Sequence, residues 1–254
     1  MAPVPPEKQR WARPSLHLEC LDVSHDGCRA FFDHAPRPDK LLDEAVSAVL
    51  DALYHDVVGW TPPPVRRVLL KLHDFEGVAY TCSSELDPLH KEIHLSVSYV
   101  AGVAHRARAA DAPDHIRLEV QGVVAHEMVH VFQYNGKGTV PGGVIEGIAD
   151  WVRQRAGVGA PHWRRERPAD DAPWDAGYEK TGFFLEWLSK RLDKPDLVPL
   201  LNGEMKDGEW DDGAVLRRLL DGNEVGDLFR EYRNSFSRLD KEQDPPRPVP
   251  THAA

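Results

Sequence analysis

The stretch Val123-Val124-Ala125-His126-Glu127-Met128-Val129-His130-Val131-Phe132 decides how this chain is interpreted. It contains two histidines four residues apart, with a glutamate directly after the first, which is the H-E-x-x-H pattern. On a helix each residue advances about 100°, so His126 and His130 lie about 40° apart and can reach one metal ion. Glu127 lies about 60° from His130, where its carboxylate can approach a metal-bound water without becoming a ligand. Because neutral imidazole suits zinc, the pattern predicts a Zn²⁺ site with one open position.

The residues around the motif predict that it lies on a helix. The run from Asp114 to Tyr134 has no internal proline, and Asn135-Gly136 supplies a helix stop. Its apolar residues include Ile116, Leu118, Val120, Val123, Val124, Val131 and Phe132. The motif therefore occupies the C-terminal half of the predicted helix.

A third ligand has to come from another segment. Gln133 and Gly136 stand where metzincins have glycine and histidine, so that subclass is excluded. The run from Val144 to Gly157 predicts a second helix, on which Glu146 and Asp150 share a face. We expect Glu146 to bind the metal and Asp150 to accept the free ring N–H of a ligand histidine. The alternative is a solvated acidic face on a surface helix.

These segments resemble a known family. The motif segment, continued to Tyr134, and the run Glu146-Gly147-Ile148-Ala149-Asp150-Trp151-Val152-Arg153 are similar to the basic secretory protein family of plants and bacteria. Matching stretches also occur at 77–81, 91–96, 177–181 and 184–188, and the resemblance runs from about Leu16 to Phe236. It implies a gluzincin-type zinc peptidase core that hydrolyses peptide bonds. It carries His126, His130 and Glu146 over as ligands and Glu127 as general base.

The chain as a whole predicts an α+β fold of the zincin type. A mixed N-terminal sheet, with an edge strand beside the active-site helix, precedes a helical C-terminal part. The predicted strands are 16–23, 65–72, 78–82 and 93–99, and the predicted helices are 39–54, 114–134, 144–157, 178–192, 214–220 and 225–236. We expect one domain over residues 15–240, a flexible segment over 1–14 and a disordered proline-rich tail over 241–254.

The run from Ile93 to Tyr99 alternates apolar and polar residues, as a half-exposed edge strand does. In gluzincins an edge strand beside the cleft pairs with an extended substrate, and this run is a candidate for that strand. An ordinary edge strand is the equal alternative. His94 on this run is interpreted as a surface or packing histidine.

Tyr178 is the candidate transition-state stabiliser. It opens a predicted helix after a polar loop, 159–176, that can fold over a cleft. Its hydroxyl could share the oxyanion charge that forms when water attacks a carbonyl. A packed aromatic residue with an exposed tip is the alternative.

Composition limits the partners. The net charge of −10 argues against nucleic acid, and no apolar run is long enough to span a membrane. Without an apolar leader segment we expect a cytoplasmic chain, or a secreted one if a leader was removed. Cys20, Cys28 and Cys82 have no zinc-ligand spacing, and Cys20 and Cys28 could pair only in an oxidising compartment. We expect a monomer that acts on peptide or protein substrates.

The combined expectation is a zinc metallopeptidase. Two other classes stay open: a metal-binding defence or interaction protein without peptidase activity, and a zinc hydrolase of a non-peptide amide or ester.

Overall fold

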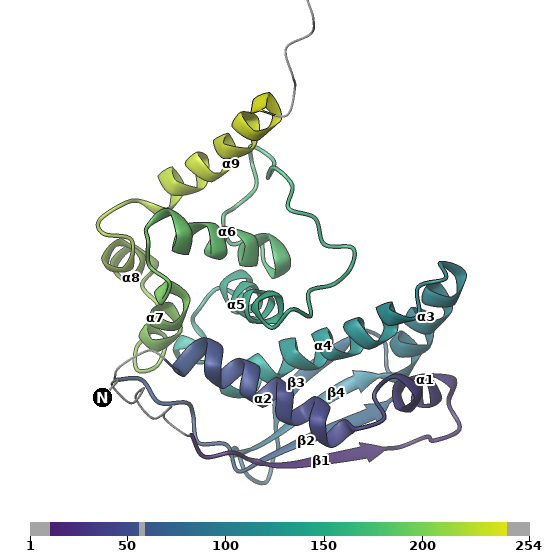
Figure 1. Cartoon of the computed structure of the whole chain (residues 1–254). Helices are drawn as coiled ribbons and strands as arrows, with labels where there is room; N and C mark the ends of the chain where they lie inside the picture. Colours follow the sequence, from purple (N-terminus) through teal and green to yellow (C-terminus); the bar gives the residue numbers. More distant parts are fainter. Residues whose placement is uncertain (1–10, 56–58, 243–254) are drawn as a thin grey trace, which may run out of the picture.

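The structure, a computed structural model, describes residues 11–55 and 59–242. The first part of the chain forms a sheet with helices on one side, and the later helices stack above these (Figure 1). The elements are β1 (Ser15–Cys20), α1 (Asp26–His34), α2 (Pro38–Tyr54), β2 (Arg67–His73), β3 (Ala79–Ser83), β4 (His90–Ser96), α3 (Val97–Ala109), α4 (Asp114–Phe132), η1 (Gly136–Gly138), α5 (Gly142–Arg155), α6 (Tyr178–Arg191), α7 (Leu197–Glu204), α8 (Asp212–Leu219) and α9 (Val225–Glu242).

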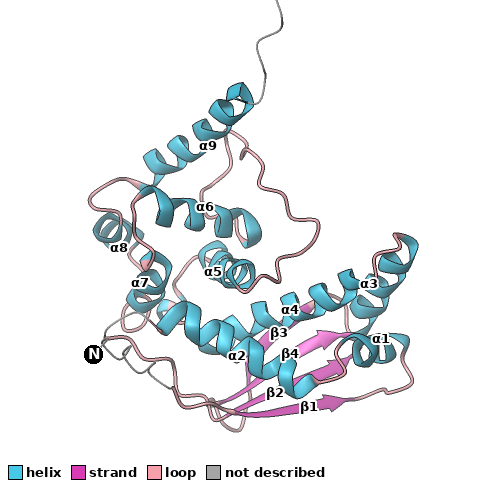
Figure 2. Ribbon diagram, in the orientation of Figure 1, coloured by secondary structure: helices cyan, strands magenta, loops and turns pink. Residues whose placement is uncertain are grey.

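The sheet has the strand order β1-β2-β4-β3. β1, β2 and β4 are parallel, whereas β3 runs antiparallel to β4 at one edge. Figure 2 shows this sheet in magenta beneath the helices. The chain is therefore α+β with a mixed N-terminal sheet followed by helices, as the sequence predicts.

Alternation along the strands fixes which face is covered. In β2 the side chains of Val68, Leu70 and Leu72 alternate along the strand, are fully buried and belong to the hydrophobic core that the helices share. α4 crosses this layer and contacts α2, α3, α5, β3 and β4. From Glu119 onward it is consequently buried almost all round, so the polar side chains in that part need partners inside the protein.

One predicted strand is wrong in both its end and its position. β4 ends at Ser96, and Tyr99 lies in α3. The Ser96 side chain accepts a hydrogen bond from the backbone N–H of Tyr99 (3.3 Å) and caps this helix. β4 is also an internal strand, because it pairs with both β2 and β3. The edge strand beside the motif helix is β3.

The other predicted strands and helices are present within a few residues of their expected bounds, except that α9 extends to Glu242. Three further helices, α1, α3 and α7, are not predicted by the local sequence patterns. Most of the predicted flexible N-terminal segment and disordered tail lies outside the described residues. None of the helices that the structure describes combines the length and apolar character needed to cross a membrane.

Candidate metal centre

Two helices that pack against each other supply the candidate ligands. His126 and His130 project from the C-terminal half of α4, and Glu146 projects from the first turns of α5. Gly147 lets α5 approach α6 closely, since a Cβ at this position would lie 2.3 Å from the Thr181 side chain. The backbone of α5 is thereby held between α4 and α6, with Glu146 facing the histidines.

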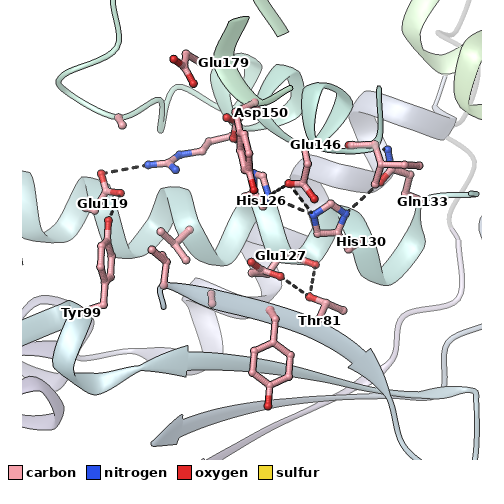
Figure 3. A pocket seen from close by; sticks show the side chains of 18 of the residues that line it. Thr81, Tyr99, Glu119, His126, Glu127, His130, Gln133, Glu146, Asp150 and Glu179 are labelled. Atoms are coloured by element: carbon pink, nitrogen blue, oxygen red, sulfur yellow. Dashed lines mark hydrogen bonds and ion pairs between the residues drawn. The ribbon is translucent and has the colours of Figure 1, made fainter. Parts of the chain in front are cut away.

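The three side chains converge as the sequence predicts. Their ligand atoms all lie within 4.8 Å of one another. The two Nε2 atoms are 3.2 Å apart, and Glu146 Oε2 lies 3.0 Å from His126 Nε2 and 3.6 Å from His130 Nε2 (Figure 3). Two nitrogens bound to one tetrahedral zinc ion are separated by about 3.3 Å. The buried His-His-Glu group could therefore hold a metal ion.

Hydrogen bonds fix how both imidazoles present their Nε2 atoms. Asp150 Oδ1 lies 2.7 Å from His126 Nδ1, and the Asp150 side chain is only 3% exposed. Gln133 Oε1 lies 3.2 Å from His130 Nδ1, while Gln133 Nε2 donates to the carbonyl of Ile145 (3.1 Å). When each Nδ1 carries the proton, both Nε2 lone pairs are free for a metal ion.

The carboxylates of Asp150 and Glu146 determine the electrostatics of the group. Burial alone would lower the pKa of His126, but hydrogen bonds with Asp150 and Glu146 raise it to about 9. Burial would raise the pKa of Glu146, but its hydrogen bonds with His126 and His130 lower it to about 2. Without a metal ion, these acids hold a proton on His126, and a divalent cation satisfies the same negative field.

Glu127 lies beside the group without joining it. Its carboxylate Oε2 accepts a hydrogen bond from Thr81 Oγ1 (2.7 Å), and Thr81 belongs to the edge strand β3 (Figure 3). Glu127 is 6% exposed. A buried carboxylate that accepts a hydrogen bond from Thr81 is thus held between the candidate metal ligands and the sheet edge.

A cavity of about 790 Å³ opens over these residues. β3 forms one wall through the consecutive residues 78–83, and α4 and α5 form the floor. Ala160, His162 and Trp163 come from the predicted polar loop. Tyr178 lines the cavity with its ring stacked on that of His126, at a centroid distance of 6.1 Å.

Tyr178 follows a strained turn. Its φ is +48°, and Gly177 before it has a φ of +94°. Gly143 packs so closely against this loop that a Cβ there would lie 1.8 Å from the carbonyl oxygen of Asp175. The negative charge of Glu146, followed by burial, raises the pKa of Tyr178, so its hydroxyl keeps its proton.

Comparison with known proteins agrees with this geometry. Residues 13–232 match the model of the BSP family, described as a peptidase of plants and bacteria. The chain belongs to this family. No curated protein and no solved structure matches the chain.

Two residues that contact the site, Gln133 and Thr81, are not predicted by the sequence patterns. Gln133 lies three residues after His130, a spacing that puts both on one side of the chain and could have indicated the contact. Thr81 lies 46 residues before Glu127 and reaches it only through the sheet, so no local spacing could have revealed it.

Proposed function

We propose that this BSP-family chain is a zinc-dependent metallopeptidase with a gluzincin-type catalytic domain over residues 15–240. The observation that carries the proposal is the buried group of His126, His130 and Glu146, with Glu127 directly beside it. Two imidazoles and one carboxylate are a donor set typical of catalytic zinc, which keeps a further position open. The family's description as a peptidase supports the reaction class.

The residues around the proposed zinc ligands have distinct roles in the proposed reaction. A zinc ion held by the three side chains would lower the pKa of a water molecule and polarise the scissile carbonyl. Glu127 accepts the proton of the attacking water and returns it to the leaving amine. Thr81 orients the Glu127 carboxylate through its hydrogen bond. Asp150 and Gln133 hold the two imidazoles in the required tautomer.

Tyr178 is proposed as the donor to the developing oxyanion. It lines the cavity above His126, and its raised pKa keeps a proton available on the hydroxyl. The side chain is 54% exposed, which leaves it free to contact a substrate in the cavity. A preorganised donor of this kind is worth about 10²- to 10³-fold in kcat.

The edge strand β3 favours an extended peptide as substrate. Ser96 N–H donates to Val78 O and Ser84 N–H donates to His90 O, so the even-numbered residues of β3 bond to β4. In an antiparallel ladder the intervening residues turn their N–H and C=O groups the other way. The free backbone groups of Ala79, Thr81 and Ser83 therefore face the cavity side, where an extended chain can pair with them.

The decisive experiment measures metal content and cleavage of a mixed peptide library, before and after chelation and zinc readdition. We expect one zinc ion at this site and cleavage that chelation abolishes. The Glu127→Gln variant should keep that zinc and lose nearly all hydrolysis. Near-wild-type turnover in this variant would refute the assigned base. Zinc without peptide cleavage would point to a binding role, or to an amide or ester substrate of another kind.

A further inference from the structure

A second cluster of metal-binding side chains lies on the opposite face of the sheet. Cys82 on β3 pairs directly with Glu92 on β4, and His94 follows two residues later on the same strand. Alternate residues of a strand share a face, so these three side chains project together. The described helices gather on the other side of the sheet (Figure 1). The cluster is thus a set of ligand atoms distinct from the His126 group, although Cys82, as part of the edge strand, also borders the cavity.

The ligand atoms in this cluster have the spacing of a tetrahedral site. Cys82 Sγ lies 3.7 Å from His94 Nε2, and Glu92 Oε2 lies 3.3 Å from the same nitrogen. All three atoms lie within 4.8 Å of one another. With the usual zinc bond lengths, tetrahedral coordination separates sulfur and nitrogen by about 3.6 Å and nitrogen and oxygen by about 3.3 Å. The cluster needs little rearrangement to hold such an ion.

Each nitrogen and oxygen ligand also has an outer partner. His73 Nε2 lies 2.8 Å from His94 Nδ1, and Lys71 Nζ donates to Glu92 Oε2 (2.7 Å). Ligating histidines and carboxylates in metalloproteins are held by such contacts. The carboxylate has lone pairs enough for both the ammonium group and a metal ion. A metal ion that displaces the Cys82 proton on binding would gain a thiolate as well as the carboxylate as anionic ligands.

Neighbouring side chains shield His94 from solvent but leave the cluster accessible to an ion. The ring of Tyr80 stacks on that of His94 at a centroid distance of 4.3 Å, and the His94 residue is 9% exposed. Cys82 and Glu92 remain partly exposed, so an ion can enter from solvent and keep a water as its fourth ligand.

We propose that Cys82, Glu92 and His94 form a second zinc site that ties the edge strand β3 to β4. The opposite face of β3 carries Thr81, which contacts Glu127. An ion at the second site therefore stabilises the strand that lines the catalytic cavity.

Cobalt(II) distinguishes the two sites, because only the second contains sulfur. Metal-free, reduced protein is titrated with Co²⁺, and the thiolate-to-cobalt charge-transfer band is followed in the near ultraviolet. We expect the band in the wild-type protein and its loss in Cys82→Ser, together with one bound cobalt fewer per chain. The matched control is Cys20→Ser, the same change at a partly buried strand residue, which should keep the band.

A band that is missing from the wild-type protein, or that survives in Cys82→Ser, would overturn the proposal. Alkylation of the wild-type protein provides a test that requires no variant to fold. Zn²⁺ should slow modification of Cys82 at least tenfold when the sites are mapped by mass spectrometry. An unchanged rate would also overturn the proposal. Neither readout depends on whether the His126 group supports hydrolysis.

Discussion

Replacing Asp150 with asparagine tests how strongly the protein orients one metal ligand. The substitution keeps the shape of the side chain and an oxygen that can accept a hydrogen bond from His126 Nδ1. In the wild-type protein Asp150 Oδ1 lies 2.7 Å from this nitrogen. It removes the charge from a group that is 3% exposed. Hydrogen bonds to charged groups contribute about 1.5–3 kcal/mol and neutral ones about 0.5–1.5 kcal/mol. We expect metal affinity to fall by about 10- to 100-fold, the usual cost of losing such an outer partner.

The size of this defect should depend on pH. In the metal-free protein, burial opposes protonation of His126, but the Asp150 and Glu146 hydrogen bonds raise its pKa to about 9. A metal ion therefore competes with a proton at neutral pH. Loss of the Asp150 charge lowers the pKa of His126, so protons compete less with the metal ion in the variant. At neutral pH this gain offsets part of the loss of metal affinity. Near pH 9 the competition fades, so the full loss of affinity should appear there.

The assay is a competition titration with a chromophoric chelator at several pH values. Glu179→Gln is the matched control, because Glu179 lines the same cavity from α6 and undergoes the same kind of change (Figure 3). Gln133→Ala should cost less than tenfold, since it removes a longer, neutral contact of 3.2 Å to His130. Wild-type affinity of Asp150→Asn near pH 9, or an equal loss in Glu179→Gln, would refute the reasoning.

Three further predictions follow from the same geometry. In the metal-free protein, the raised pKa of His126 contributes stability that is complete below about pH 6.5 and lost as pH rises through about 9. Denaturant titrations should show this decline, and saturating zinc should remove it; a flat profile in the metal-free protein would contradict the ion-pair geometry. Gly143→Ala should destabilise the fold by about 1–3 kcal/mol and slow hydrolysis, because the added Cβ meets the backbone before Tyr178. Gly142→Ala, where a Cβ would meet nothing within 4 Å, should be neutral by the same thermal and kinetic measurements. N-methylation of alternate substrate amides should lower kcat/KM about fivefold to tenfold where the amide pairs with β3, and equal effects at every position would argue against strand pairing.

Local patterns were enough to predict the ligand helices. The apolar spacing of α4 and the Pro141-Gly142-Gly143 run at the start of α5 define both segments, and the four-residue spacings place His126 with His130 and Glu146 with Asp150. The sequence could not show that these two faces meet. That depends on how α5 packs against α4 on one side and, through Gly147, against α6 on the other, which only tertiary packing determines.

The misplaced edge strand has a local cause. Ser96 continues the alternation of β4, yet its hydroxyl also caps α3, and the capping bond ends the strand. Alternation counts side chains and does not register such a bond. The order of the strands is likewise invisible to a local pattern, because β4 becomes internal only when β3 folds back against it.

The charges at the site explain why the histidine pair of α4 and the carboxylate pair of α5 occur together. Asp150 is almost fully buried and Glu146 is partly buried, and two carboxylates in such surroundings are costly unless cations face them. In the metal-free protein His126 provides one positive charge through its raised pKa. A divalent ion provides two, and it binds the Nε2 atoms without breaking the His126–Asp150 bond. In the metal-free protein the negative charges of Glu146 and Asp150 exceed the positive charge of His126. A bound divalent ion would balance these two carboxylates.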